Sequence, residues 1–131
     1  MGRLDGKVCV ITGAGGGMGR EAALVFTAEG ANVCAADLDE ALAEETVSLC
    51  SGPGDVFALG IDVADEDDVV RMCAETAARF GGVDVLYNNA GISPPDDASV
   101  LDTSVEAWQR VLDVNAKGVF LCCKHGIPHL L

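Results

Sequence analysis

The sequence predicts an α/β fold, in which helices cover both faces of a parallel sheet, and three observations support this prediction. Short β-branched runs alternate with longer amphipathic stretches along all 131 residues, which is typical of parallel strands joined by helices. The first run, residues 7–12 (KVCVIT), contains an unbroken apolar stretch, as expected of a strand buried on both faces. A glycine-rich turn then leads directly into a helical segment. Because 50% of its residues are hydrophobic, the chain can form one compact domain with a core.

The first three strands and two helices follow one another closely. We expect them in this order: strand Lys7–Thr12, helix Gly19–Glu29, strand Ala31–Ala36, helix Asp39–Cys50 and strand Val56–Ile61. Gly30 ends the first helix, because glycine adopts the left-handed backbone that often follows a helix. Residues 51–54 (SGPG) end the second helix, since glycine and proline interrupt regular structure.

A third helix is expected after the third strand. Asp65 is its expected N-cap, and the acidic residues at 66–68 lie in its first turn, beside the positive end of the helix dipole. Hydrophobic residues at helical spacing predict its buried stripe, which consists of Val69, Cys73, Ala77 and Phe80.

The last part of the chain predicts one more strand and one more helix. The strand is Val83–Tyr87, and it leads into Asn88–Gly91. A polar loop, Ser93–Thr103, follows. Thr103 or Ser104 then caps a fourth helix that runs from about Val105 towards the end. Trp108 is expected to pack within this helical layer.

These elements predict a Rossmann-type, doubly wound parallel sheet that is truncated after the fourth strand and fourth helix. We therefore interpret residues 1–131 as the N-terminal portion of a single NAD-binding domain. The fourth strand would form an open edge, and one apolar face of the last helix would lack cover, namely Val114, Val119, Phe120 and Leu121. The chain looks cut rather than complete, and we expect weak thermal stability and self-association.

Charge and cysteine content narrow the functional classes. A net charge of −13 repels phosphate backbones, so nucleic acid and anionic membranes are poor partners. No apolar run approaches the roughly 18 residues of a membrane helix. The six cysteines lack the spacing of a zinc site or a redox motif, and we expect reduced, mostly buried thiols. A cytoplasmic protein is the simplest interpretation.

The glycine-rich turn carries the clearest chemistry. Gly13, Gly17 and Gly19 form a G-x-x-x-G-x-G pattern, with Gly16 and Met18 between them. Placed between a buried strand and a helix, such a turn aims backbone N–H groups and the helix dipole at a pyrophosphate. A merely flexible loop is the alternative, and its position between these two elements disfavours it.

Asp37 follows the second strand and predicts the cofactor. A carboxylate there accepts hydrogen bonds from an adenosine ribose and repels a 2′-phosphate. Neither the glycine-rich turn nor Leu38 offers a lysine or arginine to bind that phosphate. NAD (NAD⁺/NADH) is therefore preferred over NADP. A solvated acid before a helix is the alternative interpretation of Asp37.

Five motifs in order resemble the short-chain dehydrogenase/reductase family, and the resemblance covers the whole chain from Leu4 onward. The motifs are Thr-Gly-x-x-x-Gly-x-Gly at 12–19, the acid at Asp37, Asp62-Val63, Asn-Asn-Ala-Gly at 88–91 and Val-Asn-x-Lys-Gly at 114–118. Each motif is weak alone, but together on the expected elements they are highly specific.

The resemblance implies roles for further residues. Asp62 would bind the adenine amino group with help from the Val63 backbone, and Asn89, Ala90 and Gly91 would lie along the cofactor. Asn115 matches the family's catalytic asparagine, which sits at a kink in the fourth helix and holds a water in the proton relay. Simpler interpretations remain for each: an acid that closes a strand, a turn built by asparagine and glycine, and an exposed helical asparagine.

The family's serine and Tyr-x-x-x-Lys pair have no match in these residues. The only tyrosine is Tyr87, and the residue four positions later is Gly91. No general base of that type is therefore present. His125 and His129 have a spacing that can bind metal, but no third ligand accompanies them, and we expect no metal site.

The sequence thus predicts an NAD(H)-dependent oxidoreductase that transfers a hydride between nicotinamide and a secondary alcohol or carbonyl substrate. This chain lacks the serine and the Tyr-x-x-x-Lys pair, so we expect it to bind the cofactor far better than it converts substrate. A non-catalytic module that binds NAD or another nucleotide is the alternative. A reading frame that continues past Leu131 into a Tyr-x-x-x-Lys motif would favour the enzyme. The resemblance also implies a homo-oligomer in the full-length form.

Overall fold

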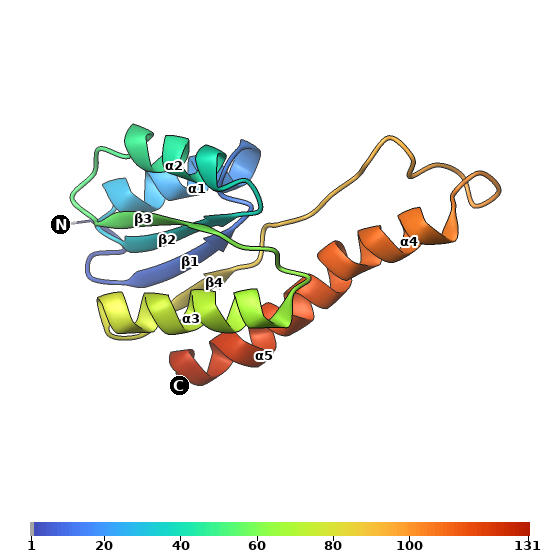
Figure 1. The fold of residues 1–131 in the computed structure, drawn as a ribbon. Helices are drawn as coiled ribbons and strands as arrows, with labels where there is room; N and C mark the ends of the chain where they lie inside the picture. The colour runs from blue at the N-terminus through green and yellow to red at the C-terminus, as the bar shows by residue number, and fades with distance from the viewer. Residues whose placement is uncertain (1) are drawn as a thin grey trace.

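A computed structural model describes residues 2–131 and contains one four-stranded sheet with helices on both faces (Figure 1). Its elements are β1 (Val8–Thr12), α1 (Gly17–Ala28), β2 (Asn32–Asp37), α2 (Glu40–Leu49), β3 (Val56–Gly60), α3 (Glu66–Phe80), β4 (Val85–Tyr87), α4 (Val105–Leu112), the π-helical η1 (Asp113–Lys117) and α5 (Gly118–Leu130). Helices α1 and α2 cover one face of the sheet, and α3 and α5 cover the other. The expected doubly wound fold is confirmed.

All strand pairs are parallel, in the order β3-β2-β1-β4. In the central strand β1, Val10 lies opposite Cys34 on β2 and Leu86 on β4. Strand β4 pairs only with β1, so it is an outer strand of this sheet, as expected. Alternate residues of β1 enter two cores. Val10 packs on the α3 and α5 side, and Ile11 packs on the α1 and α2 side.

Two helices begin where their capping residues predict. The Asp65 carboxylate accepts the N–H of Asp68 at the start of α3, and the Ser104 hydroxyl accepts the N–H of Ala107 at the start of α4. Helix α1 begins at Gly17 rather than at the expected Gly19. The glycine-rich turn is therefore already helical over its last three residues.

The buried stripe of α3 differs from the expected one. Val69 and Cys73 are buried, but the other two buried positions are Met72 and Thr76, whereas Ala77 and Phe80 are only half-buried. The observed set follows the 3.6-residue period, while steps of four residues drift around the helix. Phe80 instead contacts Phe57 near the start of β3, with ring centroids 5.6 Å apart.

The final helical stretch is not one continuous α-helix, and it is interrupted around Asn115, where the family resemblance implies a kink. Its middle, Asp113–Lys117, is a π-helical turn, in which the N–H of Gly118 donates to the carbonyl oxygen of Asp113. Leu121 was expected to lack cover, but it is buried in the core beside α3. Close approach explains this, because a Cβ at Gly118 would lie 2.7 Å from Cγ2 of Val63.

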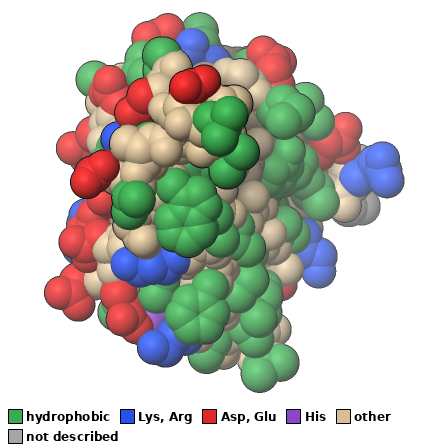
Figure 2. All heavy atoms as spheres, turned by 90° about the vertical axis from the view of Figure 1, so that its right-hand side faces the viewer, with side chains coloured by type: hydrophobic (Ala, Val, Ile, Leu, Met, Phe, Trp, Pro, Cys, Tyr) green, Lys and Arg blue, Asp and Glu red, His purple; other side chains and the backbone are tan. Residues whose placement is uncertain are grey.

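The surface around α4 is hydrophobic. Trp108, expected to pack within the helical layer, is 56% exposed, and Val105 is 76% exposed. Phe120 is exposed as expected, while Val114 and Val119 are half-buried. Figure 2 shows hydrophobic side chains gathered across this face, with acidic side chains concentrated along one side.

The six cysteines are free thiols, and four of them are buried. Burial raises the pKa of Cys34 to about 12 and that of Cys9 to about 11. Such thiols act as small apolar groups rather than nucleophiles. Within residues 2–131, no helix has both the length and the apolar character needed to cross a membrane.

Candidate cofactor-binding site

The carboxyl ends of the parallel strands meet at the edge of the sheet nearer α4 (Figure 1). A cleft of about 610 Å³ lies at this edge. Ligands of open α/β folds bind outside the carboxyl ends of the strands, which makes this cleft the candidate site. Seven of the residues expected to bind cofactor line it, namely Gly13, Asp37, Leu38, Asp62, Val63, Ala90 and Gly91.

The glycine-rich turn closes one side of this cleft, and two of its glycines adopt left-handed backbone. Gly13 has φ +67° and Gly17 has φ +51°, which disfavour a side chain. A Cβ at Gly19 would collide with the carbonyl oxygen of Gly13, so the turn and the helix approach as closely as glycine allows. Backbone conformation or steric contact therefore explains why each of these three positions holds a glycine.

The start of α1 suits an anion. Gly16 is its N-cap, no side chain in the described residues caps the helix there, and its first turn carries no acidic residue. The first N–H groups of the helix are thus available, at the positive end of the dipole. A Cβ at Gly16 or Gly17 would meet open space, so a ligand can approach the backbone. Met18 is 74% exposed and lines a separate depression with Tyr87.

Asp37 is held by two backbone groups. Its Oδ2 accepts the N–H of Gly15 at 2.8 Å, and its Oδ1 accepts the N–H of Asp39 at 2.9 Å. A Cβ at Gly15 would lie 2.8 Å from the Asp37 carboxyl carbon, so only glycine fits this contact. The neighbouring Leu38 is 76% exposed on the rim of the cleft. The carboxylate is therefore fixed in place before any ligand binds.

Asp62 and Val63 follow β3 and face the same cleft. Oδ1 of Asp62 accepts the N–H of Ala64 at 2.9 Å, and the N–H of Asp62 donates to Oδ2 of Asp68 at 3.0 Å. Val63 is only 7% exposed, with its side chain against Gly118. Its side chain thus packs against α5, and the residue also lines the cleft.

Thr12 joins the glycine-rich turn to the segment after β4. Sequence reasoning did not assign this role to Thr12. Its hydroxyl oxygen accepts the N–H groups of Asn89 at 3.1 Å and Ala90 at 3.0 Å. The amide of Asn89 donates in turn to the carbonyl oxygen of Gly13 at 3.3 Å. Only the position of Thr12 directly before the glycines could have signalled this contact.

Asn115 lies outside the cleft lining, within the π-helical turn η1. Its Oδ1 accepts the N–H of Ile92 at 2.8 Å, and its Nδ2 donates to the carbonyl oxygen of Ile92 at 2.9 Å. Ile92 lines the cleft. The side chain of Asn115 therefore fixes the segment that follows Gly91, and its amide is already occupied by backbone.

These residues fit an adenine dinucleotide. The cleft offers carboxylates for hydroxyl and amino groups, and no lysine or arginine is among its lining residues. The start of α1, which suits a pyrophosphate, follows the glycine-rich turn whose Gly13 lines the cleft. Two histidines singled out in the sequence lie elsewhere, and Nε2 of His125 contacts Glu66 at 2.7 Å. In residues 2–131, no group of three histidine, cysteine or acidic side chains is arranged to hold a metal.

Comparison with known proteins decides the family, because the sequence model described as short chain dehydrogenase matches residues 7–131. The chain belongs to the short-chain dehydrogenase family. The family resemblance noted from the motifs is thereby confirmed. Each of the five motifs contributes at least one residue to the lining of the cleft, namely Gly13, Asp37, Asp62, Val63, Ala90, Gly91 and Val114.

Curated relatives extend over nearly the whole chain. The meso-2,3-butanediol dehydrogenase of Serratia marcescens is 47% identical over 130 residues, which are 98% of this chain and 50% of the relative. The (+)-borneol dehydrogenase 2 of Salvia officinalis is 37% identical over 124 residues, or 95% of this chain and 44% of the relative. The chain thus spans about half the length of the curated relatives it matches.

Solved structures agree with this result. A short-chain dehydrogenase/reductase from Brucella melitensis, described as a glucose/ribitol dehydrogenase, superposes with a TM-score of 0.92 at 32% identity, over 98% of this chain and 54% of that one. A hydroxysteroid dehydrogenase from Escherichia coli gives a TM-score of 0.88 at 31% identity, over 97% and 53% of the two chains.

Proposed function

We propose that this short-chain dehydrogenase is an NAD(H)-dependent oxidoreductase acting on a secondary alcohol or the matching carbonyl compound. The observation that carries the proposal is the fixed carboxylate of Asp37 at the end of β2, inside the cleft. The names of its relatives include dehydrogenases of a diol and of borneol, which supports an alcohol or carbonyl substrate.

Asp37 would select the cofactor. Oδ1 and Oδ2 each accept one N–H, and a carboxylate oxygen can accept more than one hydrogen bond. The hydroxyl groups of an adenosine ribose can therefore still donate to it, whereas a 2′-phosphate would be repelled. The absence of lysine and arginine among the lining residues supports the same preference for NAD.

The other residues would bind and orient the cofactor. The start of α1, from Gly16 to Gly19, would face the pyrophosphate, and Asp62 with the Val63 backbone would face the adenine. Bound NAD supplies a hydride acceptor at its nicotinamide ring. The residues Asn89–Gly91 would lie along the cofactor, and Asn115 would hold Ile92 beside them.

Titration of NAD⁺ and NADP⁺ tests this proposal. The wild-type chain should bind NAD⁺ at least about tenfold more tightly than NADP⁺, and Asp37→Ala should reduce this ratio to about threefold or less. Asp67→Ala is the matched control, because it removes an exposed aspartate that does not line the cleft. Equal affinities of the wild type for both cofactors would remove Asp37 from this role.

A second candidate function is a nucleotide-binding module without catalysis. The observation that favours it is that residues 2–131 contain the cleft but, of the family's catalytic residues, only the match at Asn115. We expect the 131-residue chain to bind NAD⁺ without reducing it in the presence of secondary alcohols. The absorbance of NADH measures this. Formation of NADH at ordinary enzymatic rates would contradict both the expectation and the proposal of a module without catalysis.

We also propose that the protein associates with itself and that it resides in a reducing compartment of the cell. The exposed hydrophobic residues of α4, Val105 and Trp108, support pairing with a second copy (Figure 2). Sedimentation of the wild type should show dimers or larger species, and Trp108→Ser should reduce their fraction. A wild type that is monomeric at every concentration would contradict this proposal. The six free thiols support a reducing compartment such as the cytoplasm.

A further inference from the structure

One peptide group of the glycine-rich turn is held from both sides. The carbonyl oxygen of Ala14 accepts the hydroxyl of Thr46 at 2.7 Å, and the N–H of Gly15 donates to Oδ2 of Asp37 at 2.8 Å. These two groups belong to the same planar peptide unit. Thr46 on α2 and Asp37 at the end of β2 therefore fix the orientation of one unit together.

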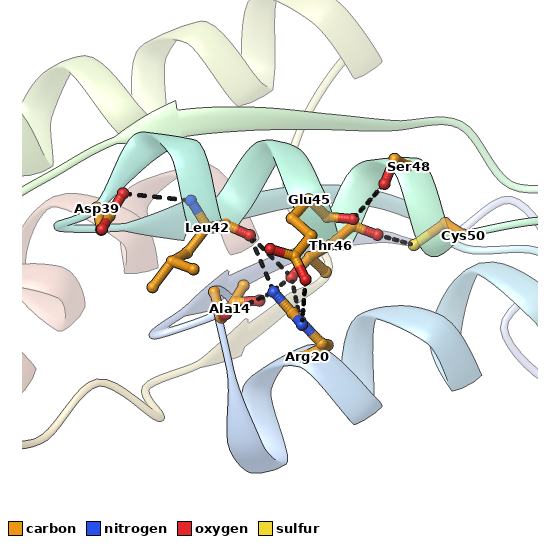
Figure 3. Close-up of polar contacts among 9 residues, drawn as sticks. Ala14, Arg20, Asp39, Leu42, Glu45, Thr46, Ser48 and Cys50 are labelled. Carbon is orange, nitrogen blue, oxygen red and sulfur yellow. Dashed lines mark hydrogen bonds and ion pairs between the residues drawn. The ribbon is translucent and has the colours of Figure 1, made fainter.

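Arg20 completes this arrangement from α1. Its Nε donates to the hydroxyl oxygen of Thr46 at 2.9 Å, and its Nη2 donates to the carbonyl oxygen of Gly15 at 2.8 Å. Figure 3 shows Arg20 reaching from α1 to Thr46 and Glu45 on α2, with Ala14 beside them. Because the Thr46 oxygen accepts from Arg20, its single proton is left to donate, and Ala14 is its shortest acceptor.

We propose that Thr46, supported by Arg20, is a positioning residue for cofactor selection. Its hydroxyl orients the Ala14–Gly15 peptide, and the N–H of Gly15 thereby holds the Asp37 carboxylate towards the ribose. Thr46 is fully buried and does not line the cleft, so it acts through this peptide rather than on the ligand. This inference rests on the proposed selection of NAD by Asp37.

The physical consequence of losing the hydroxyl is specific. Ala14 is fully buried, so its carbonyl oxygen would lose the hydroxyl donor without gaining contact with water. The peptide can then rotate, and rotation turns the Gly15 N–H away from Asp37. A carboxylate released from this N–H can leave the ribose, which weakens both NAD binding and rejection of the 2′-phosphate.

Three variants separate positioning from general destabilisation. Thr46→Val removes the hydroxyl at nearly constant shape, and Thr46→Ser retains it. Thr76→Val is the matched control, because Thr76 is also fully buried in a helix but donates to the carbonyl oxygen of Met72 in its own helix. If Thr46→Val fails to fold by circular dichroism, Thr46→Ala removes the same hydroxyl without overpacking the core and carries the same prediction.

Two measurements give the result. The ratio of NADP⁺ to NAD⁺ dissociation constants should fall roughly threefold to tenfold in Thr46→Val, the range of one lost hydrogen bond, and should stay within about twofold of wild type in Thr46→Ser and Thr76→Val. The amide of Gly15 should also exchange with solvent faster in Thr46→Val, while the amide of Val8, bound to Asp84, should not change.

The outcomes distinguish this inference from the proposed function. An unchanged ratio and unchanged Gly15 exchange in folded Thr46→Val would overturn the role of Thr46, even if wild type prefers NAD⁺. An equal fall of the ratio in Thr76→Val would also overturn it, since any buried hydroxyl would then matter. If wild type shows no preference but Thr46→Val still speeds Gly15 exchange, selection by Asp37 fails while the coupling of Thr46 to the turn stands.

Discussion

Among single residues, the glycines of the turn differ in the space around them. A Cβ at Gly19 would collide with the carbonyl oxygen of Gly13, whereas a Cβ at Gly16 would meet nothing within 4 Å. Gly16 also has an extended backbone, φ −171°, which any residue adopts. Gly19 is thus required by packing, whereas neither packing nor backbone conformation requires a glycine at position 16.

Alanine substitutions at these two glycines should differ in their effect on the free energy of unfolding. Gly19→Ala should lower the free energy of unfolding by about 1–3 kcal/mol, as overpacking does, and should weaken NAD⁺ binding. Gly16→Ala should change the free energy of unfolding by no more than about 0.5 kcal/mol. Urea unfolding of both variants measures the difference. Equal stability of the two would contradict the close approach at Gly19.

Sequence reasoning placed correctly those residues whose position follows from local spacing. Gly13 and Asp37 follow strands that the apolar pattern predicts, so their position in one cleft follows from a parallel sheet. Arg20 and Thr46 could not be found in this way, because 26 residues separate them and no spacing rule pairs them. The role of Asn115 was assigned by resemblance, and its contact with Ile92 became visible only in three dimensions.

At the scale of elements, helix α3 shows where pattern reasoning loses precision. Its existence, its cap and half of its buried stripe were predicted correctly, but Met72 and Thr76 were missed. A polar threonine satisfies its own hydroxyl by donating to the carbonyl oxygen of Met72 at 2.7 Å, so it can be buried without appearing apolar. The resemblance implied a kink at Asn115, but the π-helical form of η1 was not predicted, since no residue pattern distinguishes it from an α-helix.

The register of α3 can be tested by truncating one side chain on each face. Met72→Ala should lower the free energy of unfolding by about 2–5 kcal/mol, because it leaves a cavity in a fully buried position. Val70→Ala, on the same helix but 42% exposed, should cost far less. Chemical denaturation with a common slope gives both values. A larger effect at Val70 would show that the helix presents its other face to the core.

Across the whole molecule, Glu66 links the start of α3 to α5. Its Oε1 lies 2.8 Å from Nζ of Lys124 and 2.7 Å from Nε2 of His125. Hydrogen bonding by Lys124, and then by His125, lowers the pKa of Glu66 from its ordinary 4.5 to about 2. Two segments far apart in the sequence are thus joined on the surface.

This link predicts a pH dependence. A carboxyl with a depressed folded pKa adds stability above its unfolded pKa, and this stability is lost as the pH falls through the folded pKa. The free energy of unfolding should therefore fall more steeply between pH 4.5 and about 2 in wild type than in Glu66→Gln. Urea titrations across that range measure it. Glu44→Gln, at an exposed glutamate of α2, is the control and should follow the wild type. High salt should reduce the difference between wild type and Glu66→Gln, because the ion pair of Glu66 with Lys124 is exposed. Parallel curves for wild type and Glu66→Gln would contradict the link.

The whole fold was the most predictable feature, because the alternation of strands and helices leaves few topologies. Coverage of the last helix was less predictable. Leu121 lies in the core because Gly118 and Gly126 let α5 approach Val63 and Leu86 closely. Such close contacts depend on the absence of side chains, which a search for hydrophobic periodicity does not register.

The central claim is that the cleft at the strand ends binds the adenosine half of NAD. Amide chemical shifts recorded while ADP-ribose is added test it most directly, because this ligand lacks nicotinamide and needs no catalysis. If the cleft binds this ligand, the shifts of Gly13–Gly19, Asp37, Asp62 and Ala90 should change, and those of the α4 face around Trp108 should not. Changes confined to the α4 face, or no changes at concentrations that saturate related sites, would contradict it.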